Sequence, residues 1–264
     1  MLKNIELYAN TKKDKALSLL SKLRDFLITS GYTLSYDKNT KPDLVIGLGG
    51  DGTLLHWLNN NNYDTNAKYI GINCGTLGFL QDFEVIDIKN FVDNIPNYVE
   101  RRLHFVKLEV IKDNNKYSFF ALNDFKISAD NCKALRSQVK INNEILENFV
   151  GTSLIFSSPT GSTANNLSAG GSIICPELET IQMTPSEATI NSKLRSLSKS
   201  ICFPKEYFIN LEPITSDKIK IMADGNVVFV GNYSQITISY SDEYITKLTD
   251  TKNNYIKKIR EKLI

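Results

Sequence analysis

The sequence of 264 residues has little of what metal centres, disulfide scaffolds and membrane spans require. Its only histidines are His56 and His104, and none of its four cysteines forms a C-x-x-C pair, so we expect neither a zinc site nor a disulfide framework. No apolar run approaches the roughly 20 residues that span a bilayer. The first residues lack the apolar core of a signal peptide, so we expect a cytoplasmic protein without a membrane partner. The cysteines are Cys74, Cys132, Cys175 and Cys202.

A dominant charge is also absent. The 31 basic and 29 acidic side chains leave a net charge of +2, which offers no strong field to attract a polyanion. Nucleic acid is therefore not an expected partner. The length suffices for a sizeable core, and it accommodates two modest domains as readily as one large domain.

The most informative motif is the glycine turn Gly49-Gly50-Asp51-Gly52-Thr53, which follows the apolar run Leu44-Val45-Ile46. Glycines let backbone N–H groups approach an anion, and the N-terminus of a following helix adds a favourable dipole. An aspartate at this place would repel phosphate unless a cation or a proton transfer employs it. The turn therefore predicts phosphate handling in which Asp51 has a chemical task.

Two other interpretations of this turn stay open, an ordinary dinucleotide site and a plain strand-to-helix turn. Gly47–Gly52 also fits the pattern G-x-G-x-x-G, but the next apolar strand, Tyr69–Ile72, ends in Asn73 and Cys74 instead of an acidic residue. A P-loop is excluded because the chain has no Gly-Lys pair. His56, one helical turn after Gly52, is interpreted as a partly exposed helix residue and not as a ligand.

The first part of the chain alternates between strand and helix patterns. Such alternation predicts a mainly parallel sheet with helices on both faces, and ligands then bind beyond the carboxyl ends of the strands, where Asp51 and Asn73 would emerge. The expected strands are Ile5–Ala9, Leu44–Leu48 and Tyr69–Ile72, and the expected helical segments are Asp14–Ser30, Thr53–Asn59 and Ile86–Ile95.

Beyond Pro96 the pattern changes to successive strands with period-2 alternation. This predicts an antiparallel sandwich, with Asn142-Asn143 and Asp224-Gly225 as hairpin turns. A ligand contact is the alternative role for Asp224. The expected strands are Val106–Ile111, Tyr117–Leu122, Phe125–Ser128, Gln138–Ile141, Gly151–Ser157, Lys218–Ala223, Val227–Gly231 and Gln235–Tyr240.

The predicted fold is thus a Rossmann-like α/β domain over residues 1–98, followed by a β-sandwich domain over residues 99–245. Residues 246–264 are expected to pack back on the first domain. Within them, Asn253–Ile264 has helical spacing, with lysines on the face that we expect to be solvated. The face expected to dock carries Tyr255, Ile256, Ile259 and Leu263.

Two further loops are candidates for ligand binding. Gly75–Leu80 follows the third expected strand, and its Phe79 offers a flat surface on which a base could stack, with a place in the core as the alternative. Ser157–Ala164 is rich in hydroxyls and backbone amides, which can hydrogen-bond a neutral polar ligand such as adenine or ribose.

Together, four motifs in this order and spacing resemble the NAD kinases. They span residues 44–169, and weaker likeness continues in Ala188–Asn191 and Phe203–Lys205. The Gly-Gly-Asp-Gly turn alone is shared with diacylglycerol kinases, sphingosine kinases and phosphofructokinases. The motifs are Gly49–Thr53, Gly75–Leu80, Asn123-Asp124 and Pro159–Ala164.

This resemblance implies an α/β domain, a β-sandwich domain, a cleft between them, and homo-oligomers, dimers or more usually tetramers, in which a neighbouring subunit helps to complete the NAD site. It also implies transfer of the γ-phosphoryl group of ATP to the 2′-hydroxyl of the adenosine ribose of NAD. The expected cofactor is a divalent metal ion, with Mg²⁺ as the first candidate. Asp51 would be the catalytic base, and Gly49, Gly50, Gly52 and Thr53 would bind the phosphates of ATP.

The resemblance further assigns an NAD site. Asn123-Asp124 read alone is a polar turn between strands. Ala188 and Ile190 would approach the nicotinamide end, from the same or an adjacent subunit. The other residues assigned to NAD are Asp51, Gly52, Phe79, Asn123, Asp124, Thr163, Ala164, Asn165 and Ser168.

The chain departs from the family pattern at three positions. Asp124 replaces the usual glutamate, Thr152 replaces an aspartate, and Asn165 replaces a tyrosine. We therefore expect a higher Michaelis constant for NAD, which Thr152→Asp with Asn165→Tyr should lower. Two other functions stay open: a non-catalytic NAD-binding protein, and a lipid or sugar kinase that shares the turn.

Overall fold

The computed structural model describes residues 2–12, 14–35, 41–75, 78–84, 87–130, 133–191, 195–250 and 255–264. Thr76 and Leu77 of the second motif, Ile86, Cys132 and Asn253 lie outside the described residues. The chain forms two compact units. Unit 1 comprises residues 1–103 and 244–264, and unit 2 comprises residues 104–243.

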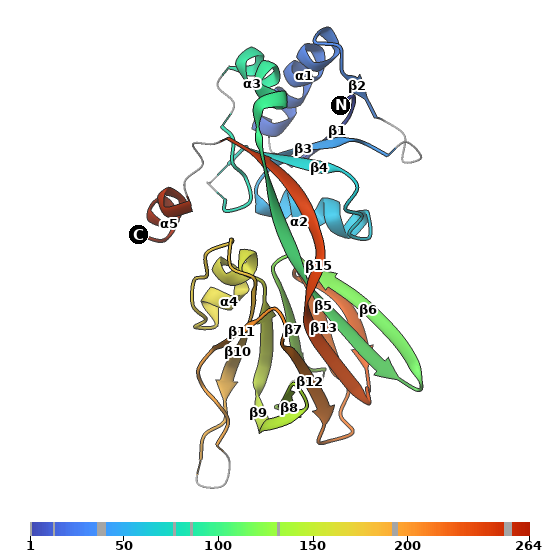
Figure 1. The fold of residues 1–264 in the computed structure, drawn as a ribbon, viewed down its shortest axis with the longest axis vertical. Helices are drawn as coiled ribbons and strands as arrows, with labels where there is room; N and C mark the ends of the chain where they lie inside the picture. The colour runs from blue at the N-terminus through green and yellow to red at the C-terminus, as the bar shows by residue number, and fades with distance from the viewer. Residues whose placement is uncertain are drawn as a thin grey trace. The chain divides into compact units, whose positions relative to one another are not determined.

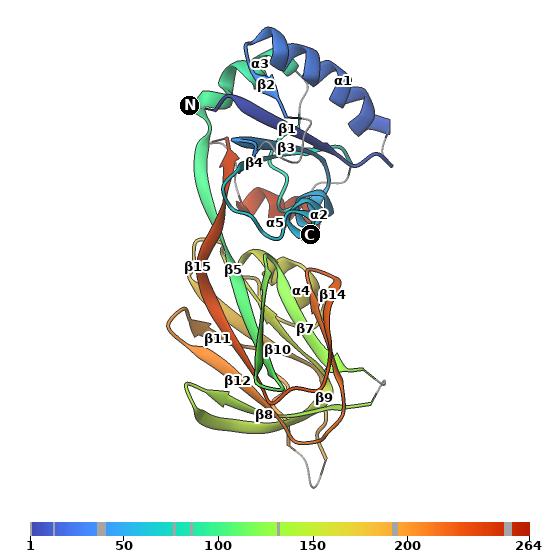
Figure 2. The ribbon, with the colours of Figure 1, turned by 90° about the vertical axis from the view of Figure 1, so that its right-hand side faces the viewer.

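Unit 1 contains a parallel sheet in the order β4-β3-β1-β2, and the last residues of β15 pair in parallel with β4 through Thr246 and Lys68. Every residue of β3 is buried, as expected for a strand with helices on both faces. Helices α1 and α3 cover one face and α2 covers the other (Figures 1 and 2). The strands are β1 (Asn4–Ala9), β2 (Thr33–Leu34), β3 (Leu44–Gly49), β4 (Lys68–Asn73) and β15 (Gln235–Thr249). The helices are α1 (Asp14–Thr29), α2 (Asp51–Asn60), α3 (Ile88–Asn94), the short 3-10 helix η1 (Ile95–Asn97) and α5 (Tyr255–Leu263).

The orientation predicted for the C-terminal helix is wrong for Ile256, Leu263 and Lys258, whereas Tyr255 and Ile259 are partly buried as expected. In α5, Lys258 is buried, whereas Ile256 is 65 % exposed and Leu263 is 39 % exposed. The reason is a buried carboxylate, Asp82, which forms an ion pair with Lys258. A buried charge must be paired, and this requirement outweighs the burial of two apolar side chains.

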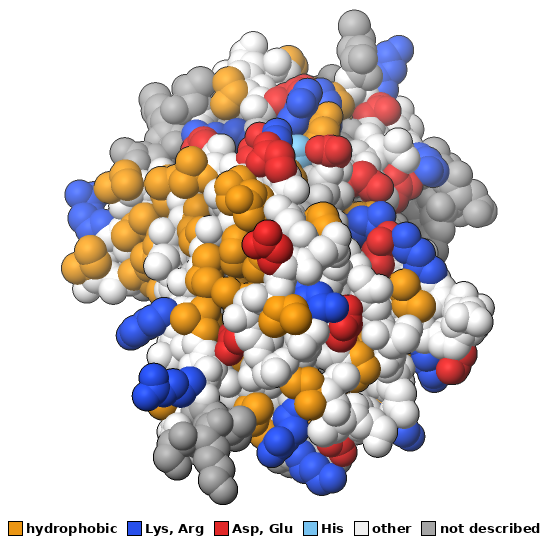
Figure 3. Space-filling model, turned by 60° about the horizontal axis from the view of Figure 1, so that its bottom comes forward, with side chains coloured by type: hydrophobic (Ala, Val, Ile, Leu, Met, Phe, Trp, Pro, Cys, Tyr) orange, Lys and Arg blue, Asp and Glu red, His pale blue; other side chains and the backbone are white. Residues whose placement is uncertain are grey.

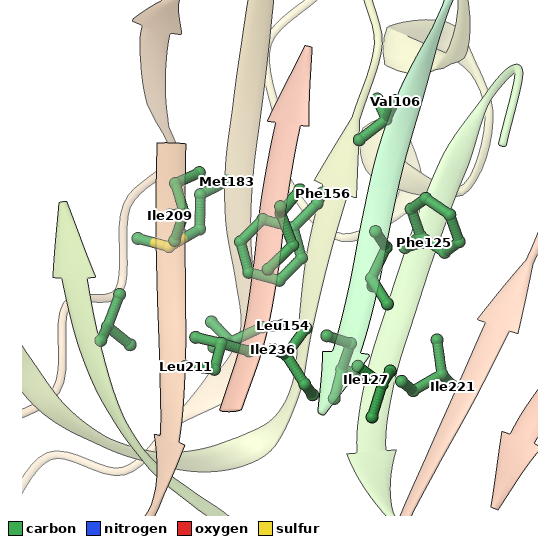
Figure 4. Packing of buried hydrophobic residues seen from close by; sticks show 14 of the residues in the cluster. Val106, Phe125, Ile127, Leu154, Phe156, Met183, Ile209, Leu211, Ile221 and Ile236 are labelled. Atoms are coloured by element: carbon green, nitrogen blue, oxygen red, sulfur yellow. The ribbon is translucent and has the colours of Figure 1, made fainter. Parts of the chain in front are cut away.

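Unit 2 is a β-sandwich around one apolar core, so the predicted fold class, an α/β domain with a β-sandwich domain, is confirmed. Phe125, Phe156 and Met183 are among the core side chains that meet in Figure 4. One run of strands has the order β14-β13-β7-β9-β8-β12, with β10 and β11 attached through β9. The strands are β5 (Val99–Lys112), β6 (Asn115–Ala121), β7 (Asp124–Ala129), β8 (Leu135–Ile141), β9 (Glu144–Ser157), β10 (Thr180–Ala188), β11 (Ile201–Pro204), β12 (Phe208–Pro213), β13 (Ile219–Ala223) and β14 (Asn226–Gly231).

Both predicted hairpin turns are confirmed. Asn142 and Asn143 have φ values of 49° and 72°, and Asp224 and Gly225 have values of 47° and 84°. Positive φ at both central residues is the geometry of a type I′ turn, which matches the twist of the strands that it joins. The turns connect β8 to β9 and β13 to β14.

Candidate active site

The glycine turn in unit 1 joins β3 to α2 through a single residue, Gly50. Gly50 is the N-cap of α2, and its N–H donates to the Thr53 hydroxyl at 3.2 Å. A Cβ on Gly49 would lie 2.1 Å from that hydroxyl, so only glycine fits there. An added Cβ on Gly52 would meet no atom within 4 Å. Gly52 therefore leaves the backbone open to a ligand, whereas Gly49 serves the packing of the turn.

Asp51 is the first residue of α2, and its carboxylate is fixed by the loop that follows β4. Oδ2 accepts from the Phe79 N–H at 2.8 Å, and Oδ1 accepts from the Leu80 N–H at 2.9 Å. Gly49 of β3 is the register partner of Asn73 of β4, so both loops leave the same edge of the sheet, as the sequence predicts. A Cβ on Gly78 would lie 1.9 Å from Asp51 Oδ1. Gly78 is thus required for the placement of the carboxylate.

Phe79 is partly exposed, and helix α5 contacts its ring. The rings of Phe79 and Tyr255 are 6.1 Å apart, and Lys262 Nζ lies 4.8 Å from the Phe79 centroid. Lys262 Nζ is also 3.6 Å from Asp51 Oδ2. The ring is therefore not a member of the apolar core, which was the alternative to a role in stacking.

A buried ion cluster holds α5 on unit 1. The Asp82 carboxylate, 1 % exposed, lies 2.6 Å from Lys247 Nζ and also forms an ion pair with Lys258. Burial raises the pKa of Asp82, but the two lysines more than offset this effect and hold its pKa below the usual value. Lys258 also donates to the Phe79 carbonyl at 2.8 Å. The cluster thereby connects α5 to the loop that fixes Asp51.

A cavity of about 610 Å³ lies beside the glycine turn. This volume is within the range of small-molecule sites. Lys12 brings a positive charge to the wall of the cavity. The exposed His56 also lines the cavity, and its Nδ1 is hydrogen-bonded to the Tyr8 hydroxyl. The lining residues are Tyr8, Ala9, Asn10, Thr11, Lys12, Gly50, Gly52, Thr53 and His56.

In unit 2, two carboxylates lie together at the start of β7. Asp224 accepts from the N–H groups of Leu122, Asn123 and Asp124 at 2.8, 2.7 and 3.3 Å. Asp124 is 5 % exposed, and burial together with the charge of Asp224 raises its pKa to about 7. Asp224 therefore does more than form a hairpin turn, because it also shapes the backbone and the charge at Asn123-Asp124.

Several hydroxyls of the loop Ser157–Ala164 form hydrogen bonds within the protein. Ser158 Oγ donates to the Leu122 carbonyl and accepts from the Gly161 N–H, and Ser162 Oγ exchanges hydrogen bonds with the backbone of Ile174. Ser157 Oγ donates to the Ser158 carbonyl. The hydroxyls of these three buried serines therefore bond within the protein and hold the loop in shape.

The remaining predicted residues of this loop lie nearer to the surface. Thr163 and Ala164 are partly exposed in and after the 3-10 helix η2 (Thr160–Thr163), and Asn165 and Ser168 are exposed in the short helix α4 (Asn165–Ser168). Asn165 Nδ2 donates to Asp124 Oδ1 at 3.3 Å, and a Cβ on Gly161 would lie 2.0 Å from the Asn123 carbonyl oxygen. The loop thus meets Asn123-Asp124.

Two predicted residues, Ala188 and Ile190, lie elsewhere on unit 2. Ala188 pairs with Gly151, whereas Asp124 pairs with Ser157. Gly151 and Ser157 are six residues apart on β9, which corresponds to about 20 Å of extended strand. Ala188 therefore does not lie close to Asp124 and the loop that meets it.

The paired strands β9 and β10 place the carboxylate of Glu187 beside Thr152, which sequence reasoning missed. Thr152 Oγ1 donates to Glu187 Oε2 at 2.6 Å, and Glu187 has a φ of 49°. A carboxylate therefore lies beside Thr152, at the position where the family pattern has an aspartate. Positive φ is uncommon for glutamate, and it aims the side chain differently from a regular strand residue.

Sequence reasoning also missed the basic groups in unit 1. Lys258 and Lys262 were assigned to a solvated helix face, and their partners are far away in the sequence. Lys12 had a usable signal, because it follows the carboxyl end of β1, the edge where open α/β sheets bind ligands.

Among the described residues, no helix is long and apolar enough to cross a membrane.

Comparisons with known proteins agree on one family. The model of the ATP-NAD kinase C-terminal domain matches residues 123–248. A relative from Finegoldia magna named NAD kinase is 33 % identical, covering 99 % of this chain and 98 % of that protein. An NAD kinase from Streptococcus pneumoniae is also 33 % identical, over 89 % of this chain and 86 % of its own length.

Two solved structures share the fold. Yeast NADH kinase in complex with NADH has a TM-score of 0.87 at 23 % identity, covering 99 % of this chain and 87 % of that chain. An NAD kinase from Archaeoglobus fulgidus in complex with ATP has a TM-score of 0.78 at 19 % identity, covering 98 % of this chain and 99 % of that chain.

Proposed function

Because this chain belongs to the NAD kinase family, we propose that it transfers the γ-phosphoryl group of ATP to the 2′-hydroxyl of the adenosine ribose of NAD. In this reaction the hydroxyl oxygen forms a bond to the γ-phosphorus, and the bond to the β,γ-bridging oxygen breaks. ADP leaves with that electron pair, the hydroxyl proton passes to a base, and the product is NADP.

The placement of Asp51 carries this proposal. Its carboxylate stands at the carboxyl end of a buried strand, in a glycine turn, with both oxygens fixed by backbone N–H donors. Each oxygen retains a lone pair that can accept the proton of a ribose hydroxyl. A positioned base contributes ~10²–10⁴ in rate, and phosphoryl transfer asks otherwise for alignment and charge neutralisation.

The cavity beside the turn is the proposed place of the phosphate donor. Gly50 and Gly52 line it together with the first turn of α2, so backbone N–H groups and the helix dipole favour an anion there. Lys12 adds a cationic donor at its wall. This arrangement suits a polyphosphate chain, whether it belongs to ATP, another nucleoside triphosphate or inorganic polyphosphate.

A divalent cation, Mg²⁺ in first place, is proposed to accompany the donor. Mg²⁺ keeps several waters and binds substrate phosphates together with one or two carboxylates. The substrate phosphates and water would supply most of its ligands, because Asp51 is the one carboxylate of the turn and is assigned as the base. When bound, the cation would neutralise charge on the phosphates.

For the acceptor, we propose that Phe79 stacks on the adenine and that Asn123 and Asp124 hydrogen-bond the ribose. Thr163, Ala164, Asn165 and Ser168 complete this group, since they lie at or near the surface of the loop that meets Asp124. Stacking on an aromatic ring and ribose hydroxyls donating to a carboxylate suit the adenosine end of a dinucleotide.

We further propose a homo-oligomer in which Ala188 and Ile190 serve the nicotinamide end from a neighbouring subunit. The separation along β9 between Gly151, which pairs with Ala188, and Ser157, which pairs with Asp124, supports this arrangement. Unit 2 exposes large apolar side chains, with Ile190 and Ile145 each 63 % exposed. Hydrophobic side chains also gather on the face of the molecule drawn in Figure 3. Such surfaces are typical of protein interfaces.

The decisive experiment is an assay of NADP formation by the purified protein. ATP, other nucleoside triphosphates and polyphosphate are supplied in turn, each with NAD and with NADH, in Mg²⁺ and in EDTA. We expect Mg²⁺-dependent phosphorylation of the dinucleotide by at least one donor. Binding of NAD without product for any donor would contradict the proposal and favour an NAD-binding protein.

A further inference from the structure

Helix α5 presents two lysines, one turn apart, to the loop that fixes Asp51, and they lie in different surroundings. Lys258 is 9 % exposed, and its ammonium is held by the Asp82 carboxylate and the Phe79 carbonyl. Lys262, four residues later, is 36 % exposed. Residues four apart share one face of a helix, so the buried lysine determines where the exposed one lies.

Lys262 reaches the reactive part of unit 1. Its ammonium is 3.6 Å from Asp51 Oδ2 and 4.8 Å from the centroid of the Phe79 ring. It therefore lies between the proposed base and the proposed stacking surface. Its exposure means that it can also reach a ligand, which the enclosed Lys258 cannot.

Stability does not require this contact. Asp51 already accepts two backbone hydrogen bonds, and a partly exposed ion pair adds only about 0–1 kcal/mol. Phosphoryl transfer, in contrast, gathers negative charge beside Asp51, which would repel a carboxylate unless a cation lies nearby. A lysine on a flexible stem can follow that charge as it moves from donor to acceptor.

We propose that Lys262 is a catalytic residue whose ammonium donates to the non-bridging oxygens of the transferring phosphoryl group. Lys258, Lys247 and Asp82 act as positioning residues, because their buried cluster fixes α5. Lys262 keeps its proton throughout, while the ribose proton passes to Asp51. This inference rests on the proposed function and adds to it a cation supplied by the C-terminal helix.

The test compares Lys262→Met with Lys257→Met. Methionine keeps the apolar stem beside Phe79 and removes only the charge. Lys257 is the matched control, since it is 61 % exposed on the same helix and lies 3.7 Å from Glu261. We expect kcat for NADP formation to fall by ~10–100-fold in Lys262→Met, toward the loss seen when a transition-state donor is removed. Lys257→Met should keep the wild-type kcat.

Three readouts separate catalysis from folding. The thermal midpoint of Lys262→Met should match that of the control. Its KM for NAD should change by less than about threefold. Lys262→Arg, which keeps the positive charge, should restore much of kcat. If Lys262→Met is destabilised, recovery of its kcat by added small primary amines replaces the thermal criterion. Failure of both Lys262→Arg and the amines to restore kcat would overturn the proposal.

Other results would also overturn it. An unchanged kcat in Lys262→Met shows that the lysine takes no part in transfer, although the wild type makes NADP. A lower KM for NAD with unchanged kcat shows that Lys262 only covers the Phe79 ring. Absence of NADP from the wild type is a different result, because it contradicts the proposed function itself.

Discussion

Asp51 in unit 1 and Asp124 in unit 2 are the same side chain in opposite surroundings. Asp51 is partly exposed, accepts two backbone hydrogen bonds, and has the Lys262 ammonium nearby. Asp124 is buried beside a second carboxylate, and its pKa is raised to about 7. Three backbone N–H groups in that region donate to Asp224.

The difference shows how one residue type can serve two tasks. Backbone donors fix a carboxylate where it can accept the proton of a substrate hydroxyl. Burial beside a like charge raises the pKa of a carboxylate, so that it gains and loses its proton near neutral pH. We therefore assign the proposed catalysis to Asp51 of unit 1, and we expect the proposed binding at Asp124 of unit 2 to depend on pH.

After the loss of the Asp51 carboxylate itself, the largest expected effect comes from filling the space beside it. In Gly78→Ala the new Cβ would lie 1.9 Å from Asp51 Oδ1, so the carboxylate must move. A misplacement of about 1 Å in a catalytic group costs on the order of 10²-fold in rate. We expect a fall of about that size in kcat/KM for NADP formation, measured by steady-state kinetics.

A double variant checks that Gly78 acts through Asp51. Adding Gly78→Ala to Asp51→Asn should cost little more than Asp51→Asn alone, because coupled residues are not additive. Full additivity of the two losses, or normal activity of Gly78→Ala, would contradict the assigned contact.

The next effect concerns pH and Asp124. Its pKa is raised to about 7, so its ionised fraction falls as the pH drops below that value. If the ionised carboxylate accepts ribose hydroxyls, KM for NAD should rise by about tenfold between pH 8 and pH 6. In Asp124→Asn the group cannot titrate, and this dependence should disappear.

Asp224 offers a way to move the same profile. Burial is the larger cause of the raised pKa of Asp124, and the Asp224 charge is the second. Asp224→Asn removes that charge, so the rise in KM should begin at lower pH. An unchanged midpoint would show that Asp224 acts only on the backbone of residues 122–124.

The smallest effect concerns the departures at Thr152 and Asn165, and the structure changes what we expect of them. Thr152→Asp would place a carboxylate beside Glu187, and Asn165→Tyr would remove a donor to Asp124. The pair should therefore not lower KM for NAD by itself. Adding Glu187→Gln removes the charge that would repel the new carboxylate, so the triple variant should show the gain from the aromatic ring at position 165, on the order of twofold to tenfold in KM for NAD. A lower KM without Glu187→Gln would restore the simpler expectation.

The sequence predicts most of the fold where periodicity is strong. Strands β3, β4, β7 and β9 follow apolar runs, and both hairpins follow their turn residues. Strand β10 was missed because it contains Pro185 and the buried Gln182, which weaken a strand pattern. The strands β11 and β12 were also missed. The orientation of α5 was wrong because Asp82, the partner of Lys258, is 176 residues away.

For the candidate site, the sequence locates the turn but not the contacts. Asp51 and the two loops are recognisable from glycines, hydroxyls and their positions after strands. That Gly78 makes room for Asp51, that Glu187 faces Thr152, and that Lys262 reaches Asp51 depend on packing between distant segments. Such pairs leave no periodic trace in a single sequence.

The most direct test of the account compares Asp51→Asn with the wild type in two measurements on the same preparations, kcat for NADP formation and the dissociation constant for NAD. The asparagine keeps the shape of the side chain and removes the base. We expect kcat to fall by ~10²–10⁴, with NAD binding within a few-fold of the wild type. Retained NADP formation in Asp51→Asn would contradict the central claim that the carboxylate in the glycine turn is the catalytic base.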